Sequence, residues 1–178
     1  MIGHQTVSTL SGVAVRTLAD LWPSPCRAVI VGVNPAPRSV EVGHYYQGSN
    51  GRTAMTRLRA AGLLPPEAGG FVDDEAVAAS VGFTDVVKRP TRRSSELSTA
   101  ELTEGCARLR AELELRRVPL IVCVFKPAVV ALLGRADPPG FQAGTFGVSR
   151  VFRMPGPYAP SLEATAVMSE LDAHLAGL

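Results

Sequence analysis

The sequence predicts an α/β fold, a three-layer α/β/α sandwich around a mostly parallel four-stranded sheet. Two runs, residues 28–33 and 120–125, are apolar throughout, which is typical of strands buried on both faces of a parallel sheet. Helix-like segments separate the strand candidates, as in repeated βαβ units. The 178 residues show no repeat and no low-complexity tract. They are enough for one domain, residues 1–178, with a core of ordinary size.

The N-terminal third contains one strand and two helix candidates. Residues 6–21 place apolar side chains at a spacing compatible with a leading helix that ends before Pro23. Residues 28–33 form the first strand, which stops at Asn34. Residues 53–64 predict a helix, because their pattern ends at two consecutive prolines.

The middle of the chain supplies the second strand and the longest helix. Residues 73–81 predict a short helix with acidic residues in its first turn, where the helix dipole favours them. A glycine ends that pattern, and residues 83–87 form the second strand. Ser98 followed by Glu101 is a capping-box signature, and it opens a helix over residues 99–117.

The C-terminal part supplies two further strands. Residues 120–125 form the clearest buried strand of the chain. Residues 126–133 predict a helix with proline in its first turn, where the missing N–H does no harm. After a stretch rich in glycine and proline, residues 149–154 form the last strand, and residues 161–175 form a closing helix with an apolar side.

Composition indicates a globular protein, and charge leaves its partner open. Hydrophobic residues make up 46% and charged residues 19% of the chain, and the net charge is +2. Basic residues nevertheless collect in predicted loops and helix starts: Arg38, Arg52, Arg57, Arg59, Lys88, Arg89, Arg92 and Arg93. They form a basic face for a polyanion, or they are solvated arginines that keep the chain soluble. Arg92, Arg93 and Lys126 are candidates for phosphate contacts.

Cysteines, histidines and hydropathy carry further expectations. Three cysteines without CxxC spacing argue against disulfides and zinc and favour a reducing cytoplasm. His4, His44 and His174 are scattered, and a metal site would need more ligands than they offer, so we expect no metal site. No segment approaches the roughly 20 apolar residues of a membrane span, and the N-terminus lacks a signal-peptide pattern. We therefore expect a cytoplasmic protein with no membrane partner.

Polar or unusual residues follow each of the four strands. Asn34 and Pro35 come directly after the first strand, and Asp85 lies in or just after the second. Lys126 follows the third strand, and residues 155–160 follow the fourth. Because parallel strands end at the same edge of an open α/β sheet, where ligands bind, we expect these segments to share one rim.

The rim lacks the motifs of several enzyme classes. The sequence has no GxxxxGK[ST] phosphate loop, no GxGxxG and no GxSxG nucleophile elbow. An amide, a carboxylate and the rings of Tyr45 and Tyr46 remain. An amide donates and accepts hydrogen bonds without taking a proton, and aromatic rings stack on nucleobases. These residue types predict a nucleobase pocket.

Several motifs resemble those of a known family. GVNP at residues 32–35, followed by GHYY at 43–46 and by Arg52, resembles the first motif of the mismatch-specific uracil/thymine branch of the uracil-DNA glycosylase superfamily. GFTDVVKRPTRRSSELSTAEL, residues 82–102, resembles the second-strand segment of that family. The correspondence runs in register over most of the chain.

The resemblance implies a monofunctional DNA glycosylase that works as a monomer without metal or cofactor. Such an enzyme flips uracil, a mispaired thymine or another damaged base out of double-stranded DNA and hydrolyses its N-glycosidic bond. By position, Asn34 orients the attacking water and Tyr46 stacks on the flipped base. The remaining base-pocket positions are Gly32, Val33, Pro35, Gly43 and His44. The implied DNA-binding positions are Arg52, Gly156, Pro157, Tyr158, Ala159, Pro160 and Ser161.

The sequence also departs from the family pattern. Ala36 stands where the family usually has glycine, and PGPYAP at residues 155–160 replaces the loop that supplies a wedge for the gap left by the flipped base. Asp85 stands where relatives have lysine or asparagine. It activates the water as a general base, or it is paired with Lys88 or Arg89 or caps a loop, and these interpretations stay open.

Three functions stay open at this point. The first is the glycosylase. The second is a damaged-DNA-binding protein of the same fold that has lost the chemistry. The third is an unrelated α/β enzyme of nucleoside metabolism, which would turn over free nucleosides and show no salt-dependent affinity for DNA.

Overall fold

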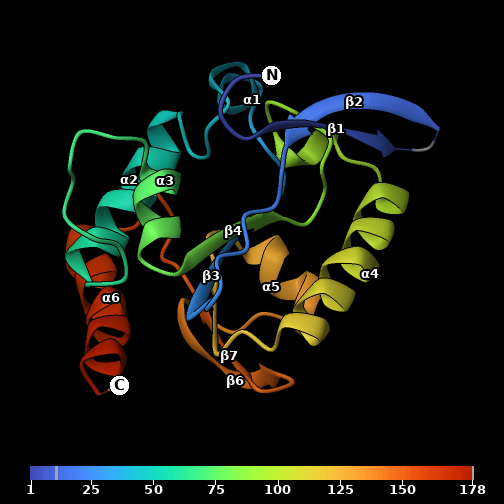
Figure 1. Ribbon diagram of the computed structural model, residues 1–178. Coiled ribbons are helices and arrows are strands. Elements are labelled where there is room, and N and C mark those ends of the chain that lie inside the picture. The colour runs from blue at the N-terminus through green and yellow to red at the C-terminus, as the bar shows by residue number, and fades with distance from the viewer. Residues whose placement is uncertain (11, 178) are drawn as a thin grey trace.

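The computed structural model describes residues 1–10 and 12–177 and has the three expected layers (Figure 1). The strands of the central sheet follow the order β4-β3-β5-β7-β6. Four of them are parallel to one another: β3 (Ala28–Gly32), β4 (Val81–Asp85), β5 (Leu120–Cys123) and β7 (Ser149–Arg153). They correspond to the four predicted strands, and the predicted α/β fold class is confirmed.

The sheet has one strand more than predicted. β6 (Gly140–Phe146) pairs antiparallel with β7 at the sheet edge, and its register shifts between Phe141 and Thr145. Its buried positions are interrupted by exposed ones, because an antiparallel edge strand does not need a continuous apolar run. Its glycines and the prolines before it gave the segment the composition of a loop, so the expected number of four strands was wrong.

Helices cover both faces of the sheet, with α2, α3 and α6 on one side and α4 and α5 on the other (Figure 1). Their bounds are α1 (Pro37–Val42), α2 (Ser49–Ala60), α3 (Val72–Ala78), α4 (Thr99–Arg116), α5 (Lys126–Leu133) and α6 (Ser161–Ala176). Ile30 of β3 belongs to one core, and Val29 and Val31 belong to the other. Within the described residues, no helix is long and apolar enough to cross a membrane.

The helix predicted at residues 6–21 is wrong. β1 (Gln5–Leu10) and β2 (Val13–Leu18) form a separate antiparallel hairpin, in which Gln5 pairs with Leu18 and Leu10 with Val13. Valine and threonine are frequent in both strands and favour extended structure. Gly12, with φ of +79°, supplies the left-handed conformation of the turn. Ser11, which also fell in the predicted helix, lies outside the described residues.

The predicted capping box of α4 is confirmed. Ser98 Oγ accepts from the backbone N–H of Glu101 at 3.2 Å, and the Glu101 carboxylate accepts from the backbone N–H of Ser98 at 2.8 Å. Arg89 also binds this carboxylate, with Nη2 3.0 Å from Oε2. One of the basic residues considered for a polyanion face is therefore used to fasten the segment after β4 to the start of α4.

Candidate active site

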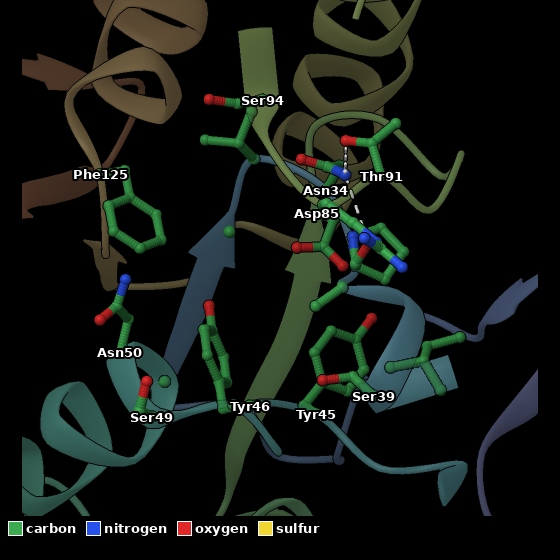
Figure 2. Close-up of a pocket in the computed structure, with 18 residues that line it drawn as sticks. Asn34, Ser39, Tyr45, Tyr46, Ser49, Asn50, Asp85, Thr91, Ser94 and Phe125 are labelled. Carbon is green, nitrogen blue, oxygen red and sulfur yellow. Dashed lines mark hydrogen bonds between the residues drawn. The ribbon is translucent and has the colours of Figure 1, made fainter. Parts of the chain in front are cut away.

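A cavity of about 320 Å³ opens at the carboxyl ends of β3 and β4 (Figure 2). It is lined by Leu18, Gly32, Val33, Asn34, Pro35, Ala36, Ser39, Tyr45, Tyr46, Gly48, Ser49, Asn50, Gly51, Asp85, Thr91, Arg92, Ser94 and Phe125. Six predicted site residues are among them: Gly32, Val33, Asn34, Pro35, Tyr46 and Asp85. The volume is at the lower end of the range for small-molecule pockets and suits a ligand the size of one pyrimidine.

The amide of Asn34 is held in one orientation. Its Nδ2 donates to Thr91 Oγ1 at 2.8 Å and to the carbonyl oxygens of Arg89 and Pro35, each at 3.3 Å. Thr91 Oγ1 donates its own proton to the Arg93 carbonyl at 2.7 Å, so it accepts from Asn34. Because all three partners are acceptors, the nitrogen must face them. Oδ1 is left on the cavity side as a hydrogen-bond acceptor (Figure 2).

Asp85 ends β4 and presents a buried carboxyl group to the same cavity. Its Oδ2 has no hydrogen-bond partner. Burial raises the pKa of Asp85 to about 7, because desolvation outweighs the opposing charges of Lys88 and Arg108. Gly32 makes room for this group, since a Cβ at that position would lie 2.1 Å from Asp85 Oδ1. A carboxyl group with this pKa exchanges protons near neutral pH, which suits acid–base chemistry.

The interpretation in which Asp85 is paired with Lys88 or Arg89 is wrong. Lys88 Nζ binds Asp20 Oδ1 at 2.8 Å, and Arg89 binds Glu101. Arg108 Nη1 also binds Asp20, at 2.7 Å, and its Nη2 donates to the backbone oxygen of Asp85. Burial alone would raise the pKa of Asp20, but these two cations outweigh it and hold that pKa below its ordinary value. Lys88 and Arg108 thus both form ion pairs with Asp20, and the Asp85 carboxyl group has no ion-pair partner.

Tyr46 has a strained backbone and a buried hydroxyl group without a partner. Its φ is +57°, a conformation uncommon for a residue with a bulky side chain. The ring packs on Phe83, with the centroids 5.9 Å apart. Burial and the nearby Asp85 raise the pKa of Tyr46 well above its ordinary value, so the hydroxyl keeps its proton and can donate it. In Figure 2 this hydroxyl points into the space between Asp85 and Phe125.

Gly43, His44 and Arg52 were predicted as site residues but lie outside the lining of this cavity. Gly43 caps the C-terminus of α1 with φ of +85°. His44 turns its ring away to Asp73, with Nδ1 2.9 Å from Oδ1. Arg52 lies in α2 and donates to the backbone oxygen of Gln47. The motif GHYY therefore contributes its two tyrosines to the cavity, while its first two residues shape and anchor the loop that carries them.

The predicted DNA-binding loop, residues 156–161, also lies outside the lining but adjoins it. Arg57 Nη1 holds the loop through the Gly156 carbonyl at 2.8 Å. The Tyr158 side chain is 87% exposed, and its hydroxyl donates to Asn50 Oδ1 at 3.3 Å. Asn50 lines the cavity, so an exposed aromatic ring stands next to the cavity residues. Pro157, Ala159, Pro160 and Ser161 belong to the same loop and the start of α6.

Six polar or aromatic lining residues were missed in the sequence: Ser39, Ser49, Asn50, Thr91, Ser94 and Phe125. Thr91 had a signal, because it belongs to the RPT part of the segment that resembles the family. Phe125 was assigned to the third strand, but β5 ends at Cys123 and Phe125 is the N-cap residue of α5. Its ring is only partly buried and reaches the cavity because the chain has already left the sheet.

A family model confirms the superfamily suggested by these motifs. The model of the uracil DNA glycosylase superfamily matches residues 20–165. This range contains Asn34, Tyr46, Asp85 and all strands of the central sheet, and it excludes the N-terminal hairpin. Because the match covers most of the chain, the protein belongs to the uracil DNA glycosylase superfamily.

Proposed function

We propose that this protein is a monofunctional, mismatch-specific DNA glycosylase that removes uracil, and mispaired thymine or other damaged bases, from double-stranded DNA. Membership of the superfamily supports a DNA glycosylase role in base excision repair. The observation that carries the finer proposal is the meeting of three groups in one cavity. These are the Asn34 amide with its free Oδ1, the unpaired Asp85 carboxyl and the Tyr46 ring.

The proposed reaction uses these groups in turn. The extruded base enters the cavity and lies against Tyr46, while Asn34 Oδ1 accepts a hydrogen bond from a water molecule. The ionised Asp85 accepts a proton from that water molecule while the oxygen of the water forms a bond to C1′ of the sugar. The C1′–N bond breaks, and its electron pair leaves with the base as an anion. The Tyr46 hydroxyl and backbone N–H groups of the cavity lining, such as that of Val33, stabilise this anion. No metal or cofactor takes part.

The test is release of uracil from a labelled duplex that contains one G·U pair, followed by alkali. We expect alkali-dependent strand breaks at the uracil position, and further breaks with some members of a panel of lesions and opposite bases. A shifted but intact duplex would instead identify a damaged-DNA-binding protein. Turnover of free nucleosides without binding to DNA would identify an enzyme of nucleoside metabolism. Either of these two results contradicts the proposal.

Arg92 is the cation best placed to contact a phosphate, because it is exposed and lines the cavity. Arg92→Ala is expected to weaken binding of duplexes with any sequence and to reduce the slope of log affinity against log salt by about 1. Fluorescence anisotropy at several salt concentrations measures both effects. Arg116→Ala is the matched control, since Arg116 ends α4 just before the start of β5, whereas the cavity lies at the carboxyl ends of the strands and Arg116 is not in its lining. Equal slopes for wild type and Arg92→Ala would exclude the contact.

Tyr158 is the proposed wedge for the space left by the extruded base. Tyr158→Ala is expected to lower the rate of uracil release from duplex DNA by about 5–150-fold, the range that corresponds to loss of one base–aromatic stack. Release from single-stranded DNA, where no gap opens, should change much less. Tyr158→Phe keeps the ring but loses the hydrogen bond to Asn50, so it should retain most activity. A Phe variant as slow as the Ala variant would assign the effect to the hydroxyl and contradict the wedge.

A further inference from the structure

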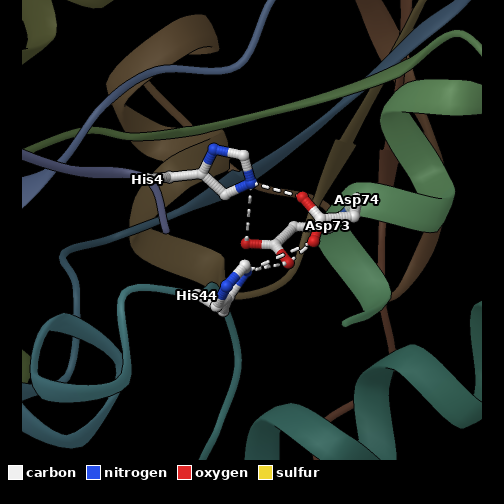
Figure 3. Close-up of side chains that lie close together, drawn as sticks. All are labelled: His4, His44, Asp73 and Asp74. Carbon is white, nitrogen blue, oxygen red and sulfur yellow. Dashed lines mark hydrogen bonds and ion pairs between the residues drawn. The ribbon is translucent and has the colours of Figure 1, made fainter. Parts of the chain in front are cut away.

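A second cluster of ionisable side chains lies outside the candidate active site. His4, His44, Asp73 and Asp74 each direct a potential metal ligand atom to a common region, and these atoms lie within 4.8 Å of one another (Figure 3). They come from three separate segments: the residues before β1, the loop after α1 and the first turn of α3. Figure 3 shows the Asp73 carboxylate between the two imidazole rings.

Two glycines allow the segments to approach so closely. A Cβ at Gly3 would lie 2.6 Å from both Gly43 O and His44 Nε2, and a Cβ at Gly43 would lie 2.2 Å from Ile2 O. Both glycines have positive φ, +53° and +85°. The backbone N–H of His4 donates to Gly43 O at 2.7 Å, which fastens the N-terminal segment to the loop. The ring centroids of His4 and His44 are consequently 5.1 Å apart.

The ligand atoms are spaced as in a small coordination site. His4 Nε2 lies 2.7 Å from Asp74 Oδ1 and 3.9 Å from Asp73 Oδ2. His44 Nδ1 lies 2.9 Å from Asp73 Oδ1 and 3.8 Å from Asp74 Oδ2. Ligands about 2.0–2.1 Å from a tetrahedral Zn²⁺ are about 3.3 Å apart, which lies within this spread. The ligand atoms that are farthest apart, up to 4.8 Å, must approach by about 1.5 Å, so the partly exposed side chains of His4 and Asp74 have to rotate toward the buried pair.

Packing fixes the positions of the two buried ligands, His44 and Asp73. The His44 ring stacks on Phe71, with centroids 3.6 Å apart and planes at 7°. Asp73 is fully buried, and its Oδ2 accepts from the backbone N–H of Tyr45 at 2.8 Å. His4 is partly exposed and Asp74 more so, with side-chain exposures of 25% and 52%. The site thus has a rigid inner half and an outer half open to solvent, through which an ion can enter.

Charge and donor type favour one class of ion. With neutral imidazoles, two carboxylates give the group a charge of −2, which a single divalent cation balances. Imidazole nitrogen suits Zn²⁺ and related transition metals, whereas Mg²⁺ and Ca²⁺ prefer oxygen ligands alone. Two nitrogens and two oxygens from four side chains complete a tetrahedral structural site without an open position.

We propose that His4, His44, Asp73 and Asp74 form a structural site for a divalent transition metal of the Zn²⁺ class. The metal joins the N-terminal segment to the loop that carries Tyr45 and Tyr46, and so stiffens one wall of the cavity. This departs from the sequence-based expectation of no metal site. That expectation considered only cysteines and histidines, and no sequence pattern indicated that residues 4, 44 and 73–74 converge. His4 precedes residues 20–165, the range matched to the superfamily, whereas His44, Asp73 and Asp74 lie within it.

Metal binding to the untagged full-length protein tests the proposal. After treatment with EDTA and its removal, titration with ZnSO₄ against a chromophoric chelator should show one Zn²⁺ bound per chain. CoCl₂ should give the intense visible absorption of tetrahedral Co²⁺. At a free Zn²⁺ concentration of about 100 times Kd, the thermal midpoint should rise by about 5–10 °C. An excess of MgCl₂ should reproduce none of these effects.

Two variants identify the ligands. His4→Ala and Asp74→Asn change partly exposed side chains, so the fold should be retained, and each should weaken Zn²⁺ binding by more than about 100-fold. His174→Ala is the control, because His174 lies in α6 beside Arg150 and far from this group in sequence. Absence of stoichiometric binding, or equal affinity of the wild type and His4→Ala, would overturn the proposal and leave a group joined by hydrogen bonds and ion pairs only. Neither readout depends on glycosylase activity.

Discussion

Asn34→Ala is expected to lower the single-turnover rate of uracil release by about 10²–10³-fold, the effect of losing the group that positions a reactant. The affinity for uncleaved duplex should change little, because the side chain is half-buried at the base of a cavity and contacts three groups of the protein itself. Rapid-quench kinetics with enzyme in excess over a G·U duplex measure the rate, and anisotropy measures the affinity.

The orientation of the Asn34 amide supplies a control. Thr91→Val removes the acceptor 2.8 Å from Nδ2 while nearly preserving volume, so the amide can rotate and present the wrong atom to the water. The rate of this variant should lie between those of the wild type and Asn34→Ala. Unimpaired base release by Asn34→Ala would defeat the role assigned to Asn34, whatever Thr91→Val does.

Asp85→Asn is expected to have the second large effect, a loss of about 10²–10⁴-fold in the rate of base release, the usual contribution of general base catalysis. In the wild type the rate should rise with pH and level off above about 7, because the base must be ionised and the pKa of Asp85 is about 7. The variant should lose this rise. The pH dependence of single-turnover rates measures both effects, and a variant that keeps the wild-type profile would exclude Asp85 as the base.

The same substitution should stabilise the fold at high pH. The pKa of Asp85 is raised by folding from 3.8 to about 7, so the folded state holds its proton more tightly than the unfolded state. The free energy of unfolding therefore falls as pH rises from about 4 to about 7, because the buried carboxyl group ionises. This loss of stability is complete above pH 7. A rise of about three in pKa corresponds to a destabilisation of the folded state by about 4 kcal/mol at high pH. Asp85→Asn should restore much of this stability, because the amide does not ionise.

Urea unfolding of wild type and Asp85→Asn at pH 5 and pH 8 separates these contributions. The variant should gain more stability, relative to the wild type, at pH 8 than at pH 5. Gly32 and Arg108 should be unaffected, because the amide has the volume of the carboxylate and keeps the backbone contact of Asp85. An equal difference at the two pH values would show that the buried carboxylate carries no such penalty.

The four parallel strands and part of the site could be predicted from the sequence for a common reason. Strands buried on both faces leave continuous apolar runs, and the ends of parallel strands fall on one edge. That rule predicts that Asn34 and Asp85 lie close together. In the structure β3 and β4 are paired with Gly32 opposite Asp85. Tyr46 depended on the resemblance to the family, because nothing local distinguishes it from Tyr45.

The remaining features depend on tertiary contacts that leave little trace in the sequence. The N-terminal hairpin has apolar spacings that also fit a helix, and pairing with a neighbouring strand decides between the two. His44 was placed at the pocket by its motif, but the buried Asp73, 29 residues away, draws its ring to the other side of the loop. Asn50 and Phe125 reach the cavity from the starts of two helices, and their composition gives no sign of it.

We propose above all that an extruded pyrimidine lies next to a hydrogen-bonded water molecule between Asn34, Asp85 and Tyr46. The most direct measurement is a crystal structure of the protein with a duplex that contains 2′-fluoro-2′-deoxyuridine opposite guanine, a substrate whose glycosidic bond is slow to break. We expect the uracil outside the helix and against Tyr46, with a water molecule between Asn34 Oδ1 and C1′ and within reach of Asp85. A uracil that stays stacked in the duplex, or that binds away from this cavity, would contradict the account.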